Sequence, residues 1–184
     1  MEIETITDDA KIAISGILNR SLLVEYDFIL NYPRIIDRLV NYDDIHDEQL
    51  IGDLDRLGKE SMKHFNDSIK LIEKLGGEPK WKLGAIERLE DAEKLLTLQL
   101  EKEHIAASLY KEAKLVATRN KKKIKVQDFF GRLIRMREEL AEDVVSVDDI
   151  IEIFDRGIID ENRHIRLVKD SLATLNMLMN KRTE

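Results

Sequence analysis

Hydrophobic residues recur at alternating steps of three and four along most of the chain, which is the spacing of one face of an α-helix. This pattern predicts a first helix from Thr7 or Asp8 to about Val40 and a second from about 47 to 75. A third helix ends at about Asn120, and a last one runs from the cap at Ser146 to about 180. Pro33 lies inside the first helix and is expected to bend it or loosen one turn.

The segments between these helices are less regular. Gly76 and Gly77, with Pro79 just beyond, end the second helix, but the pattern over 76–90 leaves open whether a long crossover follows. The sequence NKKKIKV (120–126) has the composition of a basic, solvated turn, and 127–143 reads as a shorter helix. We therefore expect an all-α protein, a four-helix bundle in one domain over 1–184, with an accessory helix inserted at about 121–146.

Polar side chains interrupt each of the four apolar stripes near its middle. These interruptions are Glu25, Ser61 with His64, Glu103, and Glu161 with His164. Three carboxylates and two imidazoles in a bundle core are costly unless a cation neutralises them, and both are natural ligands of divalent metals. Glutamates from two helices with Glu-x-x-His from the other two is the ligand pattern of di-iron carboxylate bundles. Their coincidence in phase therefore favours a metal centre.

Each of these residues also has a simpler interpretation. Taken alone, Glu25 or Glu103 is a partly exposed helix residue, and His64 is a hydrogen-bonded core or boundary histidine. Tyr32 and Tyr110 are most simply core aromatics, although either position also suits a side chain beside a metal. Three further residues are placed outside the centre: Glu101 and His104 are out of phase with Glu103, and His46 falls in a turn.

Four segments together resemble the bacterioferritins of the ferritin-like superfamily. They are LNRSLLVEYDFILNY (18–32), SMKHFNDSIKLIEKLGGEP (61–79), LQLEKEHIAASLYKEA (98–113) and IDENRHI (159–165). The resemblance implies a ferritin-like bundle in which Glu25 and His64 hold one iron, Glu103 and His164 hold the other, and Glu161 bridges them. It also makes Tyr32 the candidate catalytic residue beside the metals. Iron, or manganese in its place, is the implied cofactor, and oxidation of Fe(II) by dioxygen or peroxide is the implied activity, in iron homeostasis or oxidative-stress protection.

The chain departs from the family pattern in ways that change the expectations. The family's second bridging glutamate is Ser61 here, and the adjacent Glu60 points about 100° away on a regular helix. A π-bulge could rotate Glu60 inward, but the leucines before it stay in phase with Ser61, so we disfavour a bulge. One metal position is then expected to be weak or empty. The 121–146 insertion and the absence of a fifth-helix pattern favour a homo-oligomer, most simply a dimer, over a 24-subunit cage.

Met62 falls where bacterioferritins place a haem-ligating methionine between subunits, but packing at the flank or in a subunit contact is favoured, and haem is not expected. Rival functions are a structural subunit with a degenerate site and a haem-binding electron carrier. The net charge of −7 argues against nucleic-acid binding, and the lack of cysteine excludes thiolate sites. Neither a membrane-spanning run nor a secretory signal is evident, which predicts a cytoplasmic protein without a membrane partner.

Overall fold

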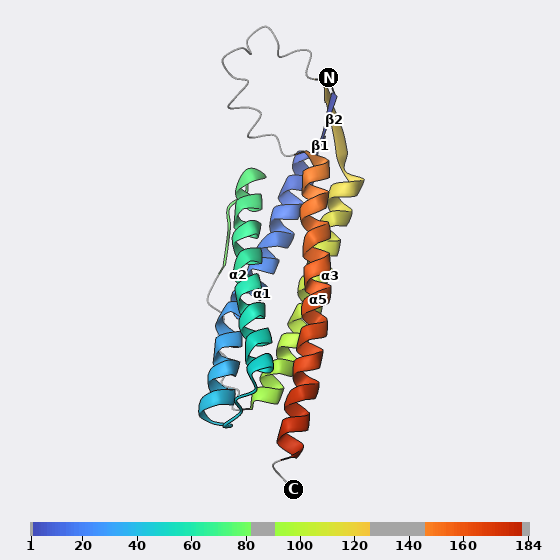
Figure 1. Ribbon diagram of the computed structural model, residues 1–184. Helices are drawn as coiled ribbons and strands as arrows, with labels where there is room; N and C mark the ends of the chain where they lie inside the picture. The colour runs from blue at the N-terminus through green and yellow to red at the C-terminus, as the bar shows by residue number, and fades with distance from the viewer. Residues whose placement is uncertain (1, 82–90, 126–145, 182–184) are drawn as a thin grey trace.

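Four long helices form an elongated bundle, with a short two-stranded ribbon at one end (Figure 1). The computed structural model describes residues 2–81, 91–125 and 146–181. The elements are β1 (Glu2–Ile6), α1 (Asp8–Asn41), α2 (Glu48–Lys74), α3 (Ala92–Arg119), β2 (Lys121–Lys125) and α5 (Val147–Asn180).

Side chains that accept hydrogen bonds from free backbone N–H groups mark the starts of the helices. The hydroxyl of Thr7 accepts from the N–H of residue 10 at 3.3 Å, and Asp47 accepts from residue 50 at 2.8 Å. The hydroxyl of Ser146 accepts from the N–H of Asp149 at 3.1 Å. These local signals are why the helix boundaries expected from the sequence are confirmed to within about two residues.

The helices pair as α1 with α2 and α3 with α5, and α1 also packs along α3. In Figure 1, α1 and α5 run in one direction and α2 and α3 in the other. The end of α2 and the start of α3 therefore lie at opposite ends of the bundle, which settles the question left open by the sequence in favour of a long crossover. The side-chain amide of Asn19 contacts the described part of this crossover. It donates to the carbonyl of Glu78 at 3.1 Å and accepts from the N–H of Lys80 at 2.6 Å.

Two apolar clusters fill the bundle, one on each side of a polar layer near its middle. One cluster contains Leu18, Leu22 and Phe154 toward the ribbon end, and the other contains Phe28 and Leu54 toward the opposite end. Burial of these side chains supplies the main stabilisation of the bundle. The packed clusters on both sides therefore fix the positions of the helices that carry the polar layer. In the described part of the chain, no helix has the length and apolar character needed to cross a membrane.

The expectation of a simple turn at 120–126 is wrong. Residues Lys121–Lys125 form β2, which pairs antiparallel with β1 so that Glu4 lies opposite Lys123. The Nζ atom of Lys121 lies 3.5 Å from a carboxylate oxygen of Glu4. The acidic partner strand lies more than a hundred residues away, so the local pattern could not reveal the pairing. The accessory helix expected at 127–143 lies outside the described residues.

Candidate metal centre

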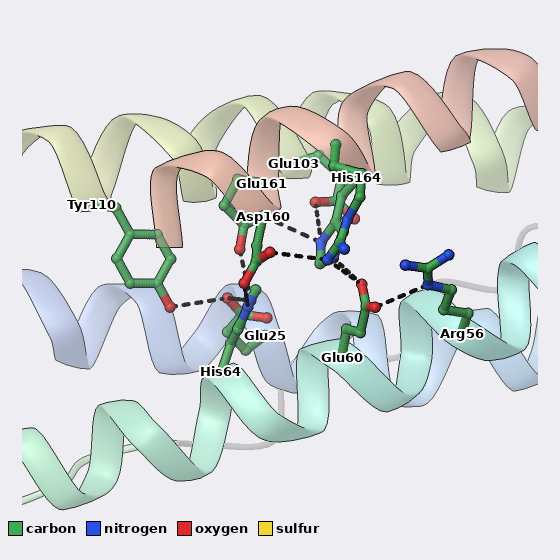
Figure 2. A network of polar contacts seen from close by, with 10 residues as sticks. Glu25, Arg56, Glu60, His64, Glu103, Tyr110, Asp160, Glu161 and His164 are labelled. Atoms are coloured by element: carbon green, nitrogen blue, oxygen red, sulfur yellow. Dashed lines mark hydrogen bonds and ion pairs between the residues drawn. The ribbon is translucent and has the colours of Figure 1, made fainter. Parts of the chain in front are cut away.

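All five residues expected to bind metal meet in the middle of the bundle (Figure 2). They come from all four helices: Glu25 from α1, His64 from α2, Glu103 from α3, and Glu161 and His164 from α5. Four of them are fully buried, and His64 is 7% exposed. Each is buried because it continues the apolar stripe of its helix, so the phase argument made from the sequence agrees with the geometry.

The two imidazole rings present the same nitrogen to the centre. Nδ1 of His64 lies 2.8 Å from Oε1 of Glu161 and 3.6 Å from Oε1 of Glu25. Nδ1 of His164 lies 3.4 Å from Oε2 of Glu103 and 3.7 Å from Oε2 of Glu161. Glu161 thus lies between the two rings, with one oxygen toward each, and Glu25 and Glu103 lie at opposite ends.

The outer nitrogens of the same rings face a second pair of carboxylates. Nε2 of His64 lies 3.4 Å from Oδ2 of Asp160, and Nε2 of His164 lies 2.8 Å from Oε2 of Glu60. An outer carboxylate fixes the ring orientation and leaves the inner nitrogen with a lone pair for a metal. The sequence placed Glu60 away from the centre and missed this contact. Glu60 faces outward on a regular helix as expected, but its side chain reaches back to the outer edge of His164.

Two arginines hold Glu60 in this position. Nε of Arg56 lies 3.0 Å from Oε1 of Glu60, and Nη2 of Arg163 lies 2.8 Å from Oε2. Arg163 also donates to Asp160 at 3.0 Å, so it joins both outer carboxylates. Glu60 consequently supports His164 from outside and does not occupy the bridging position that Ser61 leaves.

The three glutamates of the centre differ in pKa. Burial, followed by repulsion from Glu161, raises the pKa of Glu25 to about 8. Burial also raises the pKa of Glu103 to about 7. Burial disfavours the charged form of Glu161 too, but its close contacts with His164 and His64 outweigh burial and lower its pKa to about 2.

The pKa values of the two histidines shift in the opposite direction from the one that burial alone would produce. Burial disfavours their charged forms, yet contacts with Glu161 and Glu25 raise the pKa of His64 to about 11. Contacts with Glu103 and Glu161 likewise raise the pKa of His164 to about 10. Without a cation, protons therefore neutralise this cluster, which is the role that a bound metal would take over.

The arrangement of polar atoms fits a metal better than it fits a hydrogen-bond network. Although the inner atoms approach one another at 2.8–3.7 Å, several have no well-directed hydrogen-bond partner among the described residues. These atoms are Glu25 Oε2, His64 Nδ1, Glu103 Oε2, both oxygens of Glu161, and His164 Nδ1. Two ligands of one divalent ion, each bound at about 2.1 Å, lie about 3.0–3.4 Å apart. Donor atoms of His64, Glu161 and His164 all fall within 4.8 Å of one another.

Two tyrosines border the centre in matching positions. Each follows the glutamate of its own helix by seven residues and donates to the glutamate of the other helix. The hydroxyl of Tyr32 donates to Glu103 Oε1 at 2.5 Å, and that of Tyr110 donates to Glu25 Oε1 at 3.5 Å. Tyr110 fits against α5 because residue 157 is glycine, where an added Cβ would lie 3.0 Å from its ring. The shared seven-residue spacing was the signal that could have identified Tyr110 as the counterpart of Tyr32.

Ser61 lies where the sequence placed it, fully buried on the His64 face of α2, and its hydroxyl has no hydrogen-bond partner among the described residues. Residues expected outside the centre do lie outside it. Glu101, His104 and His46 are exposed, and His46 contacts Asp44 at 3.0 Å. Met62 is 44% exposed, and its interpretations as a packing residue at the flank, a subunit contact or a haem ligand stay predictions.

No protein-family model matches the chain, and no curated protein matches it by sequence. Solved structures do. A ferritin-like, di-iron-carboxylate protein from Bacillus anthracis is 17% identical, with a TM-score of 0.63, covering 89% of this chain and 97% of that one. The Rhodobacter capsulatus bacterioferritin, described with a metal-free dinuclear site and haem iron, is 20% identical, with a TM-score of 0.58 and coverages of 91% and 88%. The Desulfovibrio desulfuricans bacterioferritin, whose di-iron site was captured in different catalytic states, is 18% identical, with a TM-score of 0.63 and coverages of 93% and 84%. These likenesses show that the chain has the ferritin-like fold predicted from its sequence.

Proposed function

We propose that the chain is an iron-binding protein whose centre oxidises Fe(II) with dioxygen or peroxide. One observation carries this proposal: five buried donor side chains from four helices converge, and six of their atoms have no hydrogen-bond partner among the described residues. A buried cluster of this kind must be neutralised by protons or by a cation, and its set of carboxylate and imidazole ligands suits iron or manganese. The likeness in fold to proteins described as di-iron carboxylate proteins and bacterioferritins supports iron.

Each residue of the centre has a separate part in this proposal. Glu25 with His64, and Glu103 with His164, hold the two ends, while Glu161 presents one oxygen to each ring and serves as the bridge. Bound iron would supply electrons for reduction of the oxidant. Asp160 and Glu60 keep the imidazoles turned inward, and Tyr32, the proposed catalytic residue, donates a hydrogen bond to Glu103 and so orients that carboxylate at the centre.

Because residue 61 is serine, the proposed centre has one inward carboxylate fewer than a full di-iron site. Among the described residues, three carboxylates face the interior and two lie outside the rings. Of the outer two, Glu60 is occupied by Arg56, Arg163 and the outer nitrogen of His164, and Asp160 is occupied by Arg163 and the outer nitrogen of His64. Two divalent ions would leave uncompensated positive charge in a buried site. We therefore propose one tightly held metal and a second, weaker one.

Metal analysis of the purified protein, followed by anaerobic titration with Fe(II) or Co(II), tests the proposal. Glu161→Ala should abolish most metal binding because it removes the bridge. Glu101→Ala is the matched control, since this exposed glutamate lies two residues before Glu103 on α3 and should change little. Failure of the native protein to bind metal, or equal losses from both changes, would favour a structural subunit. A Soret band in the purified protein would favour the haem-binding alternative.

We also propose that the chain forms a homodimer through the outer face of α1 and α2. Leu23, Met62 and Trp81 are each exposed by more than two-fifths on this side of the subunit. The rings of Tyr26, Phe65 and Trp81 form a row beside them, with centroids 5.9 and 5.4 Å apart. Exposed apolar side chains that gather on one face are typical of a protein–protein contact.

A further inference from the structure

A pocket of about 560 Å³ lies between α2 and α5 and leads from the surface toward the candidate metal centre. Helices α2 and α5 pack less closely than the other neighbouring pairs, which leaves room for it. The apolar part of its wall is formed by Leu18, Leu71 and Ile153, and its inner end by His64 and Tyr110. The proposed iron-binding function does not by itself assign a role to this pocket.

The inner end of the pocket touches only one half of the centre. The rings of His64 and Tyr110, which line the pocket, stand at 75° with centroids 6.1 Å apart, and both residues contact Glu25 (Figure 2). The other half is not part of the wall. His164 is fully buried, and Glu60 with its two arginines covers the outer edge of that ring.

The charges around the pocket do not favour cations. Its wall carries four cationic side chains and three carboxylates, within a chain whose net charge is −7. These side chains are Lys63, Lys70, Lys74 and Arg156, and Asp67, Asp149 and Asp160. A wall with one more cationic than anionic side chain does not concentrate Fe(II), whereas its apolar stretch and small excess of positive charge suit small neutral molecules and small anions.

We propose that the pocket between α2 and α5 is the access route by which a small neutral or anionic oxidant reaches the Glu25 and His64 half of the centre. This inference rests on the function proposed above. Dioxygen and hydrogen peroxide are neutral molecules of suitable size, and azide is a small anionic probe that would follow the same route. Along this route, the Glu103 and His164 half lies beyond the first half.

Narrowing the pocket tests this route without measuring oxidation. Ile153→Trp should obstruct it, because Ile153 lines the pocket. Ile151→Trp is the matched control. Ile151 is likewise half-buried on α5 and packs against the same apolar cluster, but it does not line the pocket. Both variants are loaded with Co(II), and azide binding is followed by rapid mixing through the visible absorption of the metal.

An obstructed route slows arrival and departure equally. In Ile153→Trp, the association and dissociation rate constants for azide should each fall about tenfold, with the dissociation constant unchanged. The control should keep native rates. Equal rates in the two variants, or a changed dissociation constant with an unchanged association rate, would overturn the route while Co(II) binding upheld the metal centre. Failure of the native protein to bind Co(II) would overturn the proposed function and this inference together.

Discussion

At the scale of single residues, the inner nitrogens of His64 and His164 bind either a proton or a metal. Contacts with carboxylates raise the pKa of His64 to about 11 and that of His164 to about 10, so both carry protons at neutral pH when no metal is bound. Burial raises the pKa of Glu25 to about 8, so it too is protonated below that pH. Each ligand must lose its proton to bind a metal.

Metal affinity should therefore rise with pH. For a group whose pKa is raised in the metal-free protein, the proton is bound below that pKa and competes with the metal, and the competition weakens as the pH increases. Between pH 6 and 8, the logarithm of the association constant for Zn(II) should rise by at least about one unit per pH unit, because at least one proton leaves per metal bound. Competition with a chelator of known affinity measures this slope, and a flat profile would contradict the assignment of the histidines as ligands.

The missing bridge at residue 61 gives the second prediction at this scale. Ser61→Glu would restore a fourth inward carboxylate beside His64 and compensate the charge of a second ion. Anaerobic titration should then show the number of tightly bound Fe(II) ions rising toward two, and oxidation should accelerate once oxygen is admitted. Ser61→Ala is the control, because it removes the hydroxyl without adding a charge and should leave the stoichiometry unchanged. Two tightly bound ions and equally fast oxidation in the native protein would show that charge at residue 61 is not limiting.

Phase along the helices was enough to predict the inner residues of the site but not the outer ones. Glu25 and Glu103 could be placed because each interrupts an apolar stripe, and burial follows from that position. Glu60 and Asp160 belong to the polar faces of their helices, and a polar residue on a polar face gives no signal. Their contacts with the histidines depend on how closely α2 approaches α5, and the sequence does not encode that distance in a readable way.

At the scale of elements, the end of α2 depends on a glycine in a left-handed conformation. Gly76 has φ of +75°, and its N–H donates to the carbonyl of Glu73 at 2.9 Å. Gly76→Ala should lower the free energy of unfolding by about 1 kcal/mol, because a Cβ disfavours this conformation. Gly52→Ala is the matched control inside the same helix, at an exposed position with nothing within 4 Å of an added Cβ. It should raise the free energy by up to about 1 kcal/mol.

Urea denaturation of the two variants checks these opposite signs. A loss of stability in both would mean that position 52 has a constraint that its open surroundings do not show. The same contrast explains which elements could be predicted. Caps and glycine stops act over a few residues, and the sequence predicted the helix ends that they determine. The ribbon of β1 and β2 joins segments that are far apart in the chain, so no local pattern could predict it.

At the scale of the whole molecule, the proposed homodimer contact lies on the outer face of α1 and α2. Leu23 precedes Tyr26 by three residues, and Met62 precedes Phe65 by three, so each exposed residue shares a helix face with a member of the aromatic row. Leu23 and Met62 are 46% and 44% exposed. Their burial against a second copy would remove apolar surface from water on both subunits, which is the driving force expected for a homodimer.

Light scattering on the native protein should therefore give about twice the 21.4 kDa mass of the chain. The double change Leu23→Glu with Met62→Glu should shift it to the monomer mass, because each glutamate would be buried without a partner in the contact. Ile159→Glu is the control, since Ile159 is 66% exposed on α5, away from this face. Each variant should keep its helical circular dichroism, because all three positions face outward. A monomeric native protein would contradict the dimer, and equal dissociation by Ile159→Glu would move the contact away from α1 and α2.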